Sequence, residues 1–153
     1  MTNNTLQKQL FQAGSILLAV GVITGALGSH AMKGAVQEYD LNVYEVAVRY
    51  QIYHSMGLLI LGIGARRIRE DVLKGVFALF LIGIILFSGS LYLLSTSIMW
   101  ANERLEWFGA VAPFGGVSFI AGWLYLGLKG YKPSTHSSSG EKIVEMHRRK
   151  TEQ

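Results

Sequence analysis

The stretch EVAVRYQIYHSMGLLILGIGA, residues Glu45 to Ala65, raises the question on which the fold depends: whether this chain is soluble or lies in a membrane. Its second half is apolar enough for lipid, whereas its first half carries several polar and charged side chains: Arg49, Tyr50, Gln51, Tyr53 and His54. A soluble amphipathic helix would explain this mixture. A membrane helix would explain it too, provided that the polar groups find partners inside the bilayer. The rest of the chain decides between the two.

The composition and the distribution of charge favour the membrane. Half of the 153 residues are hydrophobic and only 16 % are charged, whereas a soluble domain has about a quarter of its residues charged. Uncharged residues form the intervals 9–32, 50–65, 75–102 and 107–128, and all but the second exceed the roughly 18 to 20 residues that a helix needs to cross a bilayer. No interval has the regular charged stripe of a soluble four-helix bundle. The sequence therefore predicts an all-α membrane protein, a four-helix transmembrane bundle with spans near Leu10–Gly28, Val46–Ala65, Val72–Ser95 and Trp107–Leu128.

The segments outside these spans define the predicted domain organisation. We expect one integral membrane domain over residues 1–132 and a tail over 133–153, in which the linker PSTHSSSG precedes a basic segment. The linker composition is flexible, and the basic segment suits either a solvated chain or a short amphipathic helix on anionic lipid. Between the first two spans, Asp40 and Asn42 are candidate caps for a helix that begins at Val43, which allows an interfacial helix there. The first apolar run is too long for a removable signal peptide.

The basic residues predict the orientation of the bundle. Of the 14 Lys and Arg residues, 11 lie before the first span, in the connection 66–74 or after the fourth span, and only Lys33, Arg49 and Arg104 lie elsewhere. Because positive charge collects on the cytoplasmic side, we expect a multi-pass protein of the inner (plasma) membrane with both termini in the cytoplasm. The aromatic residues assign Tyr92 to the outer interface and Trp123 to the inner one. The pI of about 9.4 then reflects lipid headgroups, and no nucleic-acid partner is expected.

Glycines in the spans indicate close packing between helices. In membranes, small residues let two backbones approach each other, and here they recur at steps of seven, four and three in the first span. No strand or phosphate-binding loop surrounds them, which argues against a ligand-cradling role. The predicted packing positions are Gly14, Gly21, Gly25, Gly28, Gly116 and Gly122.

A layer of polar residues at similar depth is the candidate site. Tyr50, Gln51 and His54 share one helical face, and Pro113 is expected to free a backbone carbonyl. We expect a neutral His54 that is bonded to Ser88 and to those carbonyls. The layer is interpreted either as a structural hydrogen-bonded layer or as a functional site. Its members are Thr24, Tyr50, Gln51, His54, Ser88, Ser90 and Pro113.

Catalytic and metal-binding constellations are not visible in the sequence. There are no cysteines, no carboxylate lies inside a predicted span, and His30 and His54 differ by roughly 10 Å in depth on ideal helical rise. We therefore expect no metal, no cofactor and no enzymatic activity. Two functions stay open: a non-enzymatic component that supports membrane integrity or stabilises other membrane proteins, or a binding or transport site for a lipid, quinone or solute near His54. A cavity that reaches His54 would favour the second.

Four blocks of the sequence carry a resemblance to a known family. GALGSHAMK (25–33), AVRYQIYHSMGLLILG (47–62), LFSGSLYLL (86–94) and APFGGVSFIAGWLYL (112–126) resemble, in this order, blocks of the YgdD/YwdK family of small bacterial inner-membrane proteins. That family is similar to the eukaryotic transmembrane protein 256. The resemblance implies a four-helix inner-membrane protein of a domain-of-unknown-function type, and it transfers no cofactor or catalytic residue. Independently of the resemblance, the apolar spans and their packing glycines lead us to expect contact with membrane lipids and with other membrane proteins or a second copy of the chain. The connection SIMWANERLEW and the tail after Lys129 depart from the family pattern.

Overall fold

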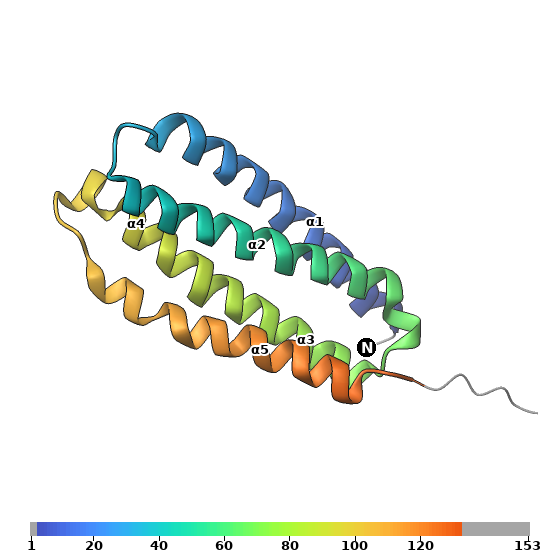
Figure 1. Ribbon diagram of the computed structural model, residues 1–153. Coiled ribbons are helices and arrows are strands. Elements are labelled where there is room, and N and C mark those ends of the chain that lie inside the picture. Colours follow the sequence, from blue (N-terminus) through green and yellow to red (C-terminus); the bar gives the residue numbers. More distant parts are fainter. Residues whose placement is uncertain (1–2, 133–153) are drawn as a thin grey trace, which may run out of the picture.

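Four apolar stretches of the sequence form four long helical rods in the computed structural model, which describes residues 3–132 (Figure 1). The first rod is α1 (Asn3–Leu27) with a π-helical turn, Gly28–Met32, and the second is α2 (Glu38–Gly64) with a 3₁₀ turn, Ala65–Arg67. The third rod joins α3 (Glu70–Gly83), a π-helical segment (Ile84–Gly89) and α4 (Ser90–Ala101). The fourth joins a 3₁₀ turn (Glu106–Ala110) to α5 (Ala112–Lys129). All four rods are long and apolar enough to cross a membrane, which confirms the predicted four-helix transmembrane bundle.

The rods are longer than the predicted spans, above all at the start of the second rod. The helix α2 begins at Glu38, after Gln37, and no side chain caps it. The predicted cap at Asp40 and Asn42 is therefore wrong, because both residues lie inside the helix. No separate interfacial helix lies between α1 and α2 among the described residues. Acidic side chains in a first turn are favoured by the helix dipole, so Glu38 and Asp40 start the helix instead of preceding it.

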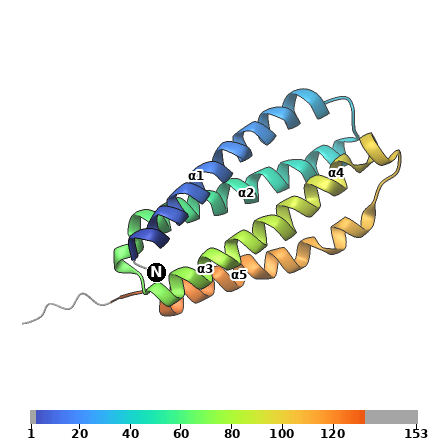
Figure 2. The same ribbon diagram turned by 180° about the vertical axis from the view of Figure 1, so that it is seen from behind.

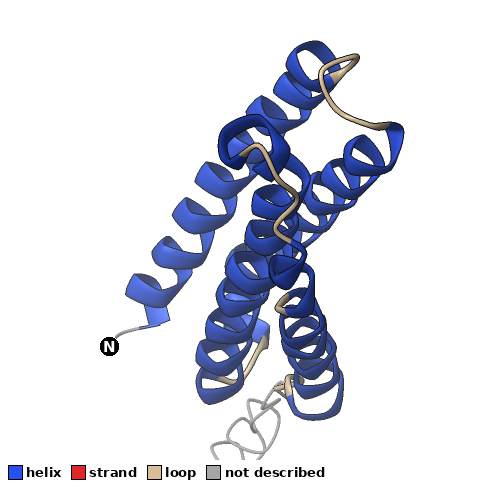
Figure 3. Cartoon of the chain, turned by 90° about the vertical axis from the view of Figure 1, so that its left-hand side faces the viewer, coloured by secondary structure: helices blue, strands red, loops and turns tan. Residues whose placement is uncertain are grey.

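The helix α2 lies at the centre of the packing. Its main neighbours are α1 on one side and α4 with the π-helical segment on the other, while α3 pairs with α5. Figure 2 shows the same order from behind, and Figure 3 shows α1 standing apart from α5. The largest buried apolar cluster joins α1, α2, α3 and α5 and contains the fully buried Leu10, Leu58, Leu73 and Phe80. Large apolar side chains also point outward, as expected where the solvent is lipid.

Several predicted packing glycines lie where two helices touch. A Cβ on Gly14 would lie 2.8 Å from the backbone nitrogen of Leu59, and one on Gly21 would lie 2.9 Å from the Ile52 side chain. Added Cβ atoms at the other predicted positions would lie 3.3 Å (Gly25), 2.6 Å (Gly28), 2.7 Å (Gly122) and 3.7 Å (Gly116) from their nearest neighbours. Gly116 thus makes only ordinary contact. Its neighbour Gly115, which is not among the predicted positions, has no room for a Cβ against the Phe87 backbone.

The two ends of the bundle differ in how the chain turns. At one end, here called the terminal end, the start of α1 and the end of α5 lie beside the turn between α2 and α3 (Figure 1). There the Arg69 N–H donates to Gly130 O at 3.0 Å and the Lys132 N–H to Arg67 O at 3.1 Å. The opposite end, here called the distal end, holds the connections 33–37 and 102–105. The predicted tail, 133–153, lies outside the described residues.

Candidate functional site

The first polar cluster, here called the Gln51 network, joins α1, α2 and α4. The Gln51 amide donates from Nε2 to the Leu17 carbonyl at 2.9 Å and accepts at Oε1 from the Tyr92 hydroxyl at 2.9 Å. The Tyr44 hydroxyl donates to the Thr24 carbonyl at 2.9 Å. Because water is absent from the bilayer core, each of these groups needs such a partner inside the protein.

The hydroxyl of Thr24 has two candidate acceptors for one hydrogen. It lies 3.1 Å from the Tyr92 oxygen and 3.0 Å from the carbonyl of Gly21, one turn earlier in α1. Because Tyr92 gives its own hydrogen to Gln51, the Thr24 hydroxyl must be the donor in both of its contacts. The Thr24 hydroxyl hydrogen is therefore shared between two acceptors, the Gly21 carbonyl of α1 and the Tyr92 oxygen of α4. The second contact links α1 directly to the third rod.

The second polar cluster surrounds His54 and joins α2 to α3 and α5. His54 Nδ1 lies 2.8 Å from the Tyr50 carbonyl oxygen, and the Trp123 indole N–H donates to Nε2 at 3.2 Å. An indole nitrogen is only a donor, so Nε2 must be the acceptor and Nδ1 must carry the proton. The geometry therefore requires the neutral imidazole. His54 is 5 % exposed, and its ring stacks on Phe119 at 3.4 Å between centroids and meets the Phe80 ring edge-on at 5.1 Å.

The predicted partners of His54 are wrong. Ser88 is fully buried, and its hydroxyl oxygen has no hydrogen-bond partner among residues 3–132. Pro113 is exposed and lies in the first turn of α5, where a missing N–H leaves no bond broken. It therefore begins the helix and frees no carbonyl in the middle of it. Ser90 donates to the Phe87 carbonyl of its own rod at 3.1 Å.

The predicted single layer is divided in two. Gln51 faces α1 and α4, whereas His54 faces α3 and α5, because three positions along an α-helix leave side chains about 60° apart. The Tyr50 ring is partly exposed and packs on Phe87 at 4.5 Å. The other halves of both clusters were not predicted, because Tyr92 and Trp123 are typical of membrane interfaces in the sequence pattern. The residue types themselves could have indicated these contacts, because a buried Tyr O–H or Trp N–H usually has a hydrogen-bond partner.

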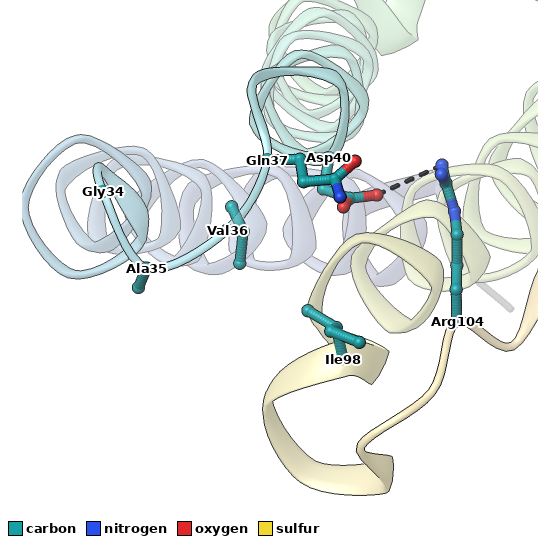
Figure 4. A pocket seen from close by; sticks show the side chains of 7 residues that line it. All are labelled: Gly34, Ala35, Val36, Gln37, Asp40, Ile98 and Arg104. Atoms are coloured by element: carbon teal, nitrogen blue, oxygen red, sulfur yellow. Dashed lines mark ion pairs between the residues drawn. The ribbon is translucent and has the colours of Figure 1, made fainter.

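A pocket of about 300 Å³ at the distal end, here called the distal pocket, is the third feature (Figure 4). Asp40 in the first turn of α2 forms an ion pair with Arg104 from the connection between α4 and α5, with Arg104 Nη2 3.1 Å from Asp40 Oδ1. The Arg104 guanidinium also lies 4.2 Å from the centre of the Tyr39 ring. From the sequence, Arg104 entered only the count of basic residues and Asp40 was predicted only as a helix cap, so their ion pair was not predicted. The lining residues are Gly34, Ala35, Val36, Gln37, Asp40, Ile98 and Arg104.

Two further cavities lie between α1 and α2. One, of about 420 Å³, lies near the terminal end beside Gln7 and Gly62, and the other, of about 210 Å³, lies nearer the distal end beside Gly28 and Tyr44. His54 lines none of these three pockets. In the part of the chain that the structure describes, no three His, Cys, Asp or Glu side chains lie together as a candidate metal site.

Comparisons with known proteins agree with this architecture. Residues 24–116 match the model of a family described as "Protein of unknown function (DUF423)". A UPF0382 membrane protein of Staphylococcus haemolyticus is 39 % identical over 119 residues, which cover 78 % of this chain and 92 % of the relative. The UPF0382 membrane protein YwdK of Bacillus subtilis is 37 % identical over 116 residues, covering 72 % and 84 %. No solved structure matches the chain. The predicted resemblance to YwdK is confirmed, and this four-helix membrane protein belongs to the DUF423 family.

Proposed function

We propose that this chain is a non-enzymatic component of the inner membrane, which supports membrane integrity or stabilises other membrane proteins. One observation carries the proposal: the polar side chains of the Gln51 network and of the His54 cluster bond the helices to one another. Gln51 and Tyr92 bond to each other and to α1, and both nitrogens of His54 are engaged. These bonds leave the two clusters without a free acid, base or nucleophile for chemistry.

The geometry around His54 favours this role over a small-molecule site. A general base must come within about 2.6 to 3.2 Å of the proton that it takes. Here the Trp123 indole occupies Nε2, and the Phe119 ring covers one face of the imidazole. A ligand would have to displace both aromatic side chains before it reached His54.

The charge distribution supports cytoplasmic termini. Arg66, Arg67 and Arg69 lie in the connection at the terminal end, where the backbone of Arg67 and Arg69 bonds to that of Lys132 and Gly130. Because basic residues beside span ends are retained in the cytoplasm, the terminal end faces the cytoplasm and the distal end faces outward.

A complementation experiment tests the proposal. In a strain that lacks the gene, the permeability of the membrane to a dye is measured after expression of wild type, His54→Gln or Gly14→Leu. A glutamine can still accept a hydrogen bond from Trp123, so His54→Gln is expected to restore wild-type permeability. Gly14→Leu is expected to fail, because the contact between α1 and α2 has no room for a side chain. A folded His54→Gln protein that does not restore the barrier would overturn the proposal.

A further inference from the structure

Asp40 in the distal pocket carries a buried acceptor without a hydrogen bond. The residue is 5 % exposed, and its Oδ1 has no hydrogen-bond partner in the described part of the chain. Arg104 Nη2 lies 3.1 Å away, at ion-pair distance, but not in the geometry of a hydrogen bond. A buried carboxylate oxygen strongly favours an N–H or O–H donor. Asp40 lines the pocket, so a ligand there can supply that donor (Figure 4).

Arg104 supplies the second charged group of the pocket, and its charge is already compensated. Besides Asp40, the Glu106 carboxylate lies 3.9 Å from Arg104 Nε, and the Tyr39 ring lies beneath the guanidinium. A guanidinium has five N–H donors, and two carboxylates at these distances do not use all of them. Arg104 can therefore bind an anionic oxygen of a ligand that also brings a positive charge.

The net charge of the distal end argues against a purely anionic ligand. Five acidic side chains lie there against three basic ones, so an anion alone would be repelled and would leave Asp40 without a donor. A cation alone could donate to Asp40, but the positive charge of Arg104 in the same pocket would repel it. A zwitterion satisfies both. The acidic residues are Glu38, Asp40, Glu45, Glu103 and Glu106, and the basic ones are Lys33, Arg49 and Arg104.

The remaining wall of the pocket is apolar and lies at the end of the spans. Ile98 belongs to the last turns of α4 and is 41 % exposed, and Val36 faces it from the connection between α1 and α2. A volume of about 300 Å³ corresponds to the liquid volume of about ten water molecules, which is enough for a small headgroup. We propose that the distal pocket binds the headgroup of phosphatidylethanolamine, with its ammonium on Asp40, its phosphate on Arg104 and its glycerol end against Ile98.

This assignment predicts a specific order among lipids. Phosphatidylcholine has the same charges but no N–H donor for Asp40 Oδ1, and phosphatidylglycerol has the phosphate but no cation. Protein purified in mild detergent is incubated with an equimolar mixture of the three lipids, and the bound lipids are counted by native mass spectrometry. We expect phosphatidylethanolamine to be retained at least about tenfold over each of the other two, which corresponds to roughly 1.4 kcal/mol.

Three variants locate the preference in the pocket. Asp40→Asn removes the carboxylate and should abolish the preference over phosphatidylcholine. Ile98→Trp fills the pocket without touching the ion pair and should abolish retention in a protein that stays folded by circular dichroism. Glu103→Gln is the matched control, because Glu103 is exposed, lies outside the lining and is in neither ion pair of Arg104, so the preference should persist.

Several results would overturn the proposal. Equal retention of the three lipids, or retention by Ile98→Trp at the wild-type level, would show that the pocket does not select this headgroup. Displacement of the bound lipid by free phosphoethanolamine at micromolar concentration would assign the pocket to a soluble zwitterion instead of a lipid. If Asp40→Asn does not fold, the retention of phosphatidylethanolamine by Ile98→Trp alone decides between the two outcomes.

Discussion

Gly115 and Gly116 are adjacent in α5 and should respond oppositely to the same substitution. A Cβ on Gly115 would fall on the backbone nitrogen of Phe87 and lie 2.8 Å from its Cα. A Cβ on Gly116 would lie 3.7 Å from the nearest atom of the Phe87 ring, which is ordinary contact. The backbone of Phe87 cannot rotate away, so Gly115→Ala must push α5 off the π-helical segment.

The expected magnitudes follow from two opposing effects. Overpacking a tight contact costs about 1 to 3 kcal/mol, and the cost should lie at the upper end here because the obstacle is backbone. Replacing Gly by Ala inside a helix gains about 1 kcal/mol. Gly115→Ala should therefore lower the free energy of unfolding by about 2 kcal/mol, while Gly116→Ala should raise it by up to about 1 kcal/mol.

Unfolding by a denaturing detergent in mixed micelles, followed by tryptophan fluorescence, measures both changes. The difference of roughly 3 kcal/mol between the two variants is insensitive to the choice of micelle, because each variant is compared under the same conditions. If Gly115→Ala unfolds no more easily than Gly116→Ala, then α5 does not rest on the π-helical segment as described.

Three further predictions concern the polar clusters and the orientation. Tyr92→Phe should lower the free energy of unfolding by about 1 to 3 kcal/mol because it leaves Gln51 Oε1 unpaired, whereas the control Tyr53→Phe, on an exposed ring, should change it little; equal effects would contradict the Gln51 network. Ser88→Ala should leave the stability unchanged or raise it by about 1 kcal/mol, since it removes an unpartnered buried hydroxyl, and a clear loss in the same titration would reveal a partner. The chain has no cysteine, so a membrane-impermeant thiol reagent added to intact cells should label Glu103→Cys and not Ser138→Cys, and the reverse pattern would exclude cytoplasmic termini.

The four spans could be predicted because crossing a bilayer imposes a length that can be counted along the chain. The ends of the helices could not be predicted in the same way, because a helix can continue beyond the hydrocarbon where its terminal turn accommodates charged residues. Asp40 and Asn42 look like the start of a helix in the sequence, yet α2 begins at Glu38, and the charges of Glu38 and Asp40 suit the positive end of its dipole. The distal pocket could not be predicted for a related reason. Asp40 and Arg104 are far apart in the sequence, and they form an ion pair only because the start of α2 and the connection 102–105 lie together at the distal end.

The polar residues could be given an expected depth from the sequence, but they could not be matched to partners. A 3.6-residue period predicts faces only while the helix stays regular, and the π-helical segment Ile84–Gly89 inserts an extra residue into the third rod. Residues on the two sides of the segment therefore do not share the face that a single α-helix would give. Ser88 lies inside this segment, which explains why it misses His54 although the sequence predicts a similar depth for the two residues.

The polar first half of the opening stretch has a physical reason that lies in the position of α2. Lipid gives little hydrophobic drive between helices, so contact between them depends on close packing and on hydrogen bonds. The helix α1 packs almost entirely on α2, and its polar contact with the third rod runs through Gln51, Thr24 and Tyr92. About 60° further around α2, His54 holds α5 through Trp123. The central helix must bond in both directions, so it carries more polar groups than its neighbours and enters the membrane with the shortest uncharged run.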